Sequence, residues 1–106
     1  MSAMAATAAR AVYSHVTKTP GVCGGKACID STRIRVMDVV WLHKEGRTPE
    51  QILAEYPDLT LEQVYAALAY YYGHKEEIEA DFVREQEAAS DFDSRKAELL
   101  ARRARE

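Results

Sequence analysis

Apolar residues recur at helical spacing in two neighbouring segments, residues 48–56 and residues 61–72, which Pro57 separates. The first segment has one apolar face, made of Ile52, Leu53 and Tyr56. In the second segment the apolar positions follow the spacing i, i+3, i+4, i+7 and i+11, and they are Leu61, Val64, Tyr65, Leu68 and Tyr72. The pattern predicts two short helices joined by a sharp turn, which is a helix-turn-helix.

The expected ends of both helices are marked by capping residues. Thr48 and Thr60 precede the helices, and each is followed three residues later by a glutamine, as in a capping box. Pro49 suits the first position of the first helix. Gly73 follows the last apolar position, where a left-handed glycine commonly ends a helix.

A third helix is expected just upstream, over residues 36–45, and it is apolar on nearly every side. Such a helix is buried from more than one direction, and in a chain of 106 residues we expect one of these directions to be a second copy. Val40 and Trp41 are therefore candidate dimer contacts. Val12 joins them, because residues 11–16 alternate like a short strand that needs a partner, either residues 32–34 or another subunit.

The pattern changes after Gly73. Residues 75–93 hold eight acidic and two basic residues, a net charge of −6, whereas residues 94–106 hold five basic and two acidic residues, a net charge of +3. Good helix formers fill this segment, but its apolar stripe is thin, so the helix is marginal by itself. We expect it to order against a partner. The candidate partner-binding residues are Tyr70, Tyr71, Ile78, Phe82, Phe92, Leu99 and Leu100.

These elements predict three parts: an N-terminal arm over residues 1–10, a strand and three-helix domain over residues 11–73, and a charged helical extension over residues 74–106. Apolar residues make up 47% of the chain and charged residues 29%, as in a globular protein. No apolar run is long enough to span a bilayer, and the alanine-rich start lacks the pattern of a signal peptide. We therefore expect a cytoplasmic protein.

Charge bears on whether the helix-turn-helix binds DNA. Residues 48–72 carry four acidic residues and no basic residue, so a phosphate backbone would repel this surface. Basic residues gather earlier in the chain, where Lys26, Arg33 and Arg35 form the candidate DNA-binding patch. Ordinary surface charge is the alternative for this patch.

The sequence holds few candidate metal-binding, phosphate-binding or catalytic residues. Cys23 and Cys28 with His15 could form part of a metal site, but structural zinc needs four ligands, and the alternative is that both thiols pack as small apolar groups. The pair Gly24-Gly25 before Lys26 departs from a phosphate-binding loop and fits a tight turn. His15, His43 and His74 lack nucleophile or carboxylate partners in a motif spacing. The sequence predicts no enzyme, no metal site and no cofactor.

Several segments together resemble a known family, domain of unknown function 433 (DUF433), over about residues 11–85. They are Gly21 to Gly25, Cys28, Thr32 to Ile34, the turn Tyr56 to Leu59, and Ala66 to Leu68. Ala27 and Ser31 stand where the family often has proline and glycine, which touches loop geometry only. The resemblance implies a homeodomain-like three-helix fold with small N-terminal strands.

The resemblance also implies a role as the antitoxin of a toxin–antitoxin pair, similar to VapB-type antitoxins, with a PIN-like ribonuclease as partner. On this hypothesis the protein is a homodimer whose charged extension folds along the toxin, and which also binds operator DNA. The alternatives are a DNA-binding regulator without a toxin and an oligomerisation module.

Overall fold

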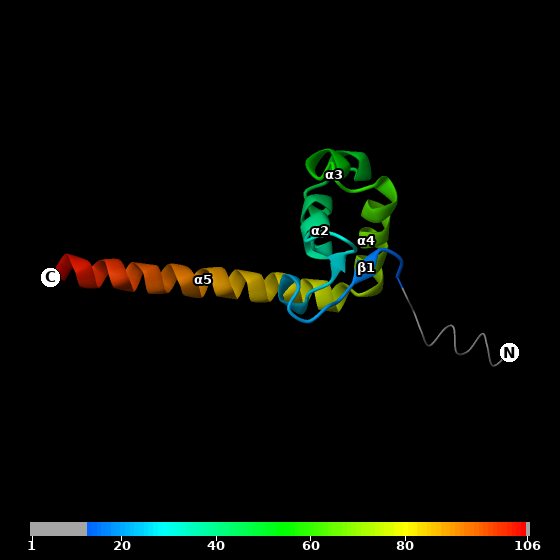
Figure 1. Cartoon of the computed structure of the whole chain (residues 1–106). Coiled ribbons are helices and arrows are strands. Elements are labelled where there is room, and N and C mark those ends of the chain that lie inside the picture. Colours follow the sequence, from blue (N-terminus) through cyan, green and yellow to red (C-terminus); the bar gives the residue numbers. More distant parts are fainter. Residues whose placement is uncertain (1–12, 106) are drawn as a thin grey trace. The chain divides into compact units, whose positions relative to one another are not determined.

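The structure is a computed structural model that describes residues 13–105. Its elements are, in order, β1 (Val16–Thr17), the 3-10 turn η1 (Cys23–Gly25), β2 (Cys28–Ile29), α2 (Val36–Lys44), α3 (Pro49–Glu55), α4 (Leu61–Gly73) and α5 (Lys75–Arg105) (Figure 1). The predicted fold class is confirmed: the protein is mainly helical, with a short antiparallel sheet near its N-terminus and a long C-terminal helix. The chain divides into two compact units, residues 1–74 and residues 75–106.

The core of the first unit lies where α2, α3 and α4 pack against one another. Its fully buried side chains are Ile29 of β2, Val36, Val39 and Val40 of α2, Ile52 of α3, and Val64 and Ala67 of α4. The helix-turn-helix of α3 and α4 is thus held by α2, which contacts both helices. Apolar burial of this kind is the main stabilising term for a small domain.

Both predicted capping boxes are present. The Thr48 hydroxyl accepts from the Gln51 amide at 3.2 Å, and the Thr48 amide donates to the Gln51 side chain at 2.9 Å. Thr60 and Gln63 make the same pair of bonds at 3.1 and 2.8 Å. Each box satisfies amide groups that have no partner within their helix, so α3 and α4 begin at the predicted residues.

The predicted core stripe on α4 is confirmed for Val64 and Leu68 and is wrong for Leu61, Tyr65 and Tyr72. Val64, Ala67, Leu68 and Tyr71 face the core, whereas Tyr65 is 52% exposed and Tyr72 57% exposed. The predicted stripe and the buried face both follow the i, i+3, i+4 spacing. The buried face is rotated about the helix axis, toward Ala67 and Tyr71. The predicted stripe included only large apolar residues and left out Ala67, which is fully buried.

Gly73 has a different role from the predicted one. Its φ is not positive, so it does not end α4 in a left-handed conformation. A Cβ at this position would overlap the hydroxyl of Tyr13 and lie 2.9 Å from its Cζ. Glycine is therefore required here for the close approach of Tyr13. The predicted cap after α2 does hold, since Gly46 has φ +90°.

The N-terminal strand pairs with a different segment from the one predicted. β1 is antiparallel to β2, with Val16 opposite Ile29 and Thr17 opposite Cys28. The segment before α2 lies beside β2 instead, through the hydrogen bond from the Ile29 amide to the Ile34 carbonyl at 2.9 Å. β1 thus has its pairing strand within the same chain, and this pairing needs no second subunit.

The dimer contacts predicted on α2 are contradicted for Val40, which is fully buried within its own chain. Trp41 is exposed. Val12 lies outside the described residues. The nearly all-apolar α2 is buried from several directions because α3 and α4 both pack on it, so its composition alone does not require a second copy.

Candidate functional site

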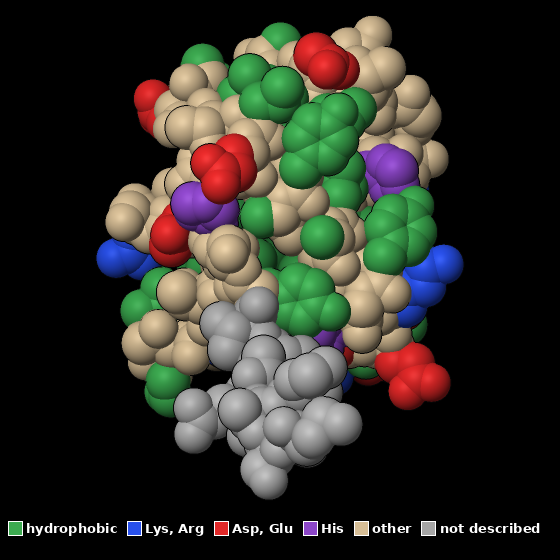
Figure 2. All heavy atoms as spheres, turned by 90° about the vertical axis from the view of Figure 1, so that its right-hand side faces the viewer, with side chains coloured by type: hydrophobic (Ala, Val, Ile, Leu, Met, Phe, Trp, Pro, Cys, Tyr) green, Lys and Arg blue, Asp and Glu red, His purple; other side chains and the backbone are tan. Residues whose placement is uncertain are grey.

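The outward face of α4 carries an apolar stripe, made of Leu61, Tyr65, Ala69 and Tyr72 at steps of four, four and three residues; we name it the α4 stripe. All four side chains are exposed to solvent. Figure 2 shows hydrophobic side chains crossing the middle of the face over α4, with acidic groups beside them. Large apolar residues aligned on the outside of a helix make this face a candidate protein-binding surface.

Tyr72 is exposed but oriented by its neighbours. Its hydroxyl lies 2.6 Å from Nε2 of His43, and the two rings make an edge contact with centroids 5.7 Å apart. Tyr71 makes a second edge contact with Tyr72 at 5.1 Å. A side chain that is already ordered loses little rotational freedom on binding, which favours recognition.

The stripe lies on the helix that would enter the DNA groove in a conventional helix-turn-helix protein. The charged residue on α4 is Glu62, and residues 61–73 contain no lysine or arginine. Phosphate contacts need cationic or hydrogen-bond-donating groups, and sequence is specified by polar groups at base edges. The surface of α4 therefore fits a protein partner better than a duplex.

Of the three predicted DNA-binding residues, Arg35 is engaged within the chain. Its backbone amide and its guanidinium donate three hydrogen bonds to the Asp38 carboxylate, at 2.9, 3.2 and 2.8 Å. This pair caps the start of α2 and balances the Arg35 charge within the chain. A role of Arg35 in DNA binding stays a prediction. Arg33 is exposed, and Lys26 is half-buried.

Tyr70 and Tyr71, predicted to contact a partner, are buried. Tyr70 stacks on His74 with ring centroids 4.1 Å apart, and Tyr13 meets Tyr70 edge-on at 5.2 Å and His74 at 5.0 Å. These three rings pack together at the C-terminal end of α4. The prediction was wrong because it placed Tyr72 in the core, and a helix cannot bury three consecutive tyrosines on one face.

The predicted partner-binding residues on α5 differ in exposure. Ile78 is buried and Phe82 half-buried, so Ile78 offers no partner surface. Phe92, Leu99 and Leu100 are 66%, 61% and 56% exposed, and they share one side of the helix; we name them the α5 stripe. The buried acid in this helix, Asp81, is paired with Arg84.

His15 connects the strand region to the start of α4, which the sequence did not predict. Its Nδ1 lies 3.4 Å from Asp30 and its Nε2 lies 3.3 Å from Glu62, while Gln63 donates to Asp30 at 3.1 Å. The hydrogen bond with Glu62 raises the pKa of His15 above 6.5, partial desolvation opposes this, and Asp30 adds to the rise. The imidazolium form is thus stabilised between the two carboxylates.

This contact predicts that stability depends on pH. Because the pKa of His15 is raised in the folded protein, its contribution is fully present below the unfolded value of 6.5 and is lost as pH rises through the folded value. The melting temperature of the wild type should therefore decrease as the pH is raised above about 6.5. His15→Gln should flatten this part of the profile, and an unchanged profile would contradict the assignment.

Cys23 and Cys28 form a disulfide, which corrects the alternative that both thiols pack as small apolar groups. The joined sulfurs cannot act as thiolate ligands together with His15. Among residues 13–105, no group of three or more His, Cys, Asp and Glu side chains is placed to hold a metal ion. Disulfides are uncommon in a reducing cytosol, so the state of this pair depends on the compartment.

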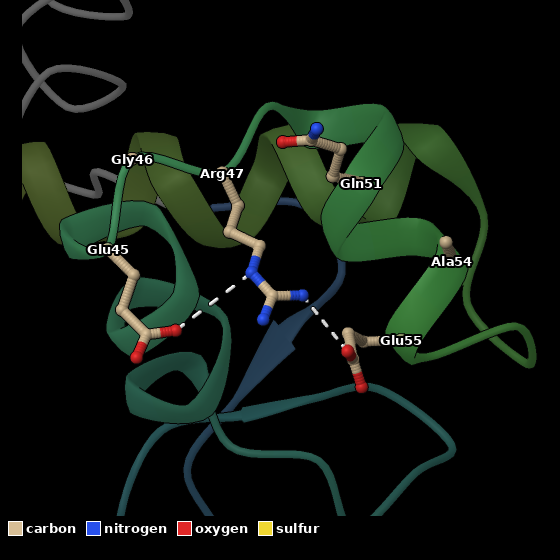
Figure 3. Close-up of a pocket in the computed structure, with 6 residues that line it drawn as sticks. All are labelled: Glu45, Gly46, Arg47, Gln51, Ala54 and Glu55. Atoms are coloured by element: carbon tan, nitrogen blue, oxygen red, sulfur yellow. Dashed lines mark hydrogen bonds and ion pairs between the residues drawn. The ribbon is translucent and has the colours of Figure 1, made fainter.

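A shallow hollow lies at the turn between α2 and α3, lined by Glu45, Gly46, Arg47, Gln51, Ala54 and Glu55 (Figure 3). Arg47 projects between two carboxylates, with Nη1 2.9 Å from Glu55 and Nε 3.9 Å from Glu45. Its charge is therefore balanced locally. The hollow fits a role in fixing the turn rather than in binding an anion.

Comparisons with known proteins are consistent with this fold. No curated protein matches the chain, and none of the described helices is long and apolar enough to cross a membrane. Among solved structures, the crystal structure of a DUF433 member protein from Anabaena variabilis is similar, with 35% identity, a TM-score of 0.62, and coverage of 77% of this chain and 81% of that chain. The family model described as "Protein of unknown function (DUF433)" matches residues 16–71. The chain belongs to the DUF433 family.

Proposed function

We propose that this protein is a non-enzymatic binding protein, the antitoxin of a toxin–antitoxin pair, and that α5 binds a PIN-like ribonuclease. The observation that carries the proposal is the exposure of the α5 stripe, Phe92, Leu99 and Leu100. Apolar side chains aligned along a solvated helix lose contact with water when a partner covers them, which stabilises a complex. The antitoxin role and the identity of the partner follow from the family resemblance.

Charge along α5 supports a partner with its own charged site. Residues 75–93 carry a net charge of −6, and Asp91 and Asp93 flank Phe92. Carboxylates bind divalent cations and basic side chains, so this part of α5 can compete for the cationic or metal-bearing site of a ribonuclease. Residues 94–106 carry +3, and a shallow groove beside Leu99 and Leu100 is lined by Lys96, Arg102 and Arg103.

The length of α5 also favours a binding role. The helix has 31 residues, and its residues from Val83 to Ala104 are exposed. An isolated helix gains most of its stability from packing of an apolar face, so a partner would stabilise the distal part of α5. Ordering on binding reduces affinity per unit area but lets a helix cover an extended surface.

The experiment uses the full chain with a PIN-like ribonuclease encoded by a neighbouring gene. Phe92→Asp combined with Leu99→Asp should weaken binding about 100-fold, because two apolar contacts would become buried charges. Isothermal titration calorimetry and neutralisation of the ribonuclease measure this effect.

The matched control is Ser94→Asp combined with Ala101→Asp, which adds the same charge on the opposite side of α5. This control should bind and neutralise like the wild type. Equal binding by both double variants would contradict the proposal, and so would wild-type protein that fails to bind the ribonuclease.

Autoregulation through operator DNA is the second candidate, and the exposure of Arg33 favours it. Lys26 and Arg33 are the residues to test, since replacing Arg35 would also remove the cap of α2. DNA binding that rests on these cations should weaken steeply with salt.

A further inference from the structure

We propose that the α4 stripe is the contact surface for a second copy of this chain, with the two α4 helices packed antiparallel about a two-fold axis. This inference is independent of the proposed function, because the stripe lies in residues 1–74 and the proposed toxin contacts lie on α5. The expectation of a homodimer was first placed on α2, where Val40 is buried. The exposed α4 stripe offers a surface for the dimer that the buried Val40 does not.

The shape of the stripe is self-complementary. In an antiparallel pair centred near Ala67, Tyr65 of one copy faces Ala69 of the other, and Leu61 faces Tyr72. The two-fold axis repeats each contact, so a large side chain meets a small one at both inner positions. Large residues that pack over small ones let two helices approach closely, as in other interlocking helix pairs. The stripe spans about 16 Å along the helix axis, from the rise of 1.5 Å per residue.

The charges around the stripe favour the antiparallel arrangement. The acidic residue Glu62 lies at the start of α4, and Asp58 precedes the helix. Parallel packing would bring the Glu62 carboxylates of the two copies to the same end of the pair, whereas antiparallel packing keeps them at opposite ends. Antiparallel packing also opposes the two helix dipoles favourably.

Tyr72 is already ordered for contact with a second copy. His43 and Tyr71 hold its ring from two sides, although more than half of the side chain is exposed. Tyrosine is enriched at the energetic centres of protein interfaces. In the proposed dimer, Leu61 of the partner covers this ring.

The test exchanges the large and small residues of the stripe in the full-length protein. Ala69→Tyr places two tyrosines against each other at both inner contacts, so it should raise the dimer dissociation constant at least about tenfold. Tyr65→Ala leaves a gap there and should also weaken the dimer. Combining Tyr65→Ala with Ala69→Tyr restores a large residue opposite a small one, so this double variant should dimerise like the wild type.

Sedimentation equilibrium over a range of protein concentrations measures each dissociation constant, and circular dichroism checks that each variant is folded. Both positions are exposed in the single chain, so folding should be retained. A wild-type protein that stays monomeric at about 100 μM would overturn the proposal, because a dissociation constant above this concentration corresponds to a weak interaction. It would also be overturned if Ala69→Tyr dimerised normally, if the double variant stayed weakened, or if only Trp41→Glu abolished the dimer.

Discussion

Replacing Ile52 with alanine is expected to lower the free energy of unfolding by about 3 kcal/mol, the usual cost of truncating a buried aliphatic side chain. Ile52 is fully buried, and it is the buried residue within α3. The helix has seven residues, so few other side chains can hold it against α2 and α4. Loss of this anchor removes apolar contact and leaves a cavity at the centre of the domain. Urea denaturation followed by circular dichroism measures the change.

Leu53→Ala is the matched control, because Leu53 follows Ile52 in the same helix and is only half-buried. It loses a side chain of the same size, and it should cost clearly less. If Leu53→Ala were as costly as Ile52→Ala, the assigned orientation of α3 would be wrong.

Replacing Gly73 with alanine is expected to lower the free energy of unfolding by about 1–2 kcal/mol, the range for losing a pair of aromatic contacts. The new methyl group would overlap the Tyr13 hydroxyl and ring. Tyr13 would have to leave its edge contacts with Tyr70 and His74. Alanine is the better helix former, which offsets part of this cost.

A double-mutant cycle separates the overlap from other effects of the new methyl group. In a Tyr13→Ala background the overlap is absent, so adding Gly73→Ala should cost nothing or stabilise the protein slightly. Additive losses from the two substitutions would show that Tyr13 is not the residue that requires a glycine at this position. Thermal and urea unfolding of the four proteins provide the measurement.

Local signals in the sequence predicted the helices well. Thr48 with Gln51 and Thr60 with Gln63 fix the starts of α3 and α4, because capping depends on residues only three positions apart. Gly46 likewise ends α2 as expected. Features that depend on contacts between distant segments of the chain were harder to predict from the sequence. The role of Gly73 depends on Tyr13, sixty residues earlier in the chain, and no local pattern reports that approach.

The phase of α4 shows a second limit. Both faces of this helix carry large apolar residues at helical spacing, so periodicity alone could not decide which face is buried. The packing of α2 and α3 decides it, through the small Ala67 and the buried Val64. The outward stripe was therefore mistaken for core, although the same pattern contained the information that α4 has two apolar faces.

Electrostatic inference from sequence has a different basis for α4 and for the basic patch. The absence of lysine and arginine from residues 61–73 is a property of the sequence, and it argues against conventional DNA recognition before any fold is known. The neutralisation of Arg35 by Asp38 could be suspected from their spacing, but only the structure shows the three hydrogen bonds.

Hydrogen exchange of the α5 amides most directly tests whether the protein acts by binding a protein partner through this helix. In the free chain, amides around Phe92, Leu99 and Leu100 should exchange fast, because their side chains make little protective contact. Adding a PIN-like ribonuclease from the neighbouring gene should slow their exchange strongly, with smaller changes in α2 and α3. Binding of the ribonuclease without new protection in residues 83–105, or no binding at all, would contradict the proposed role of α5.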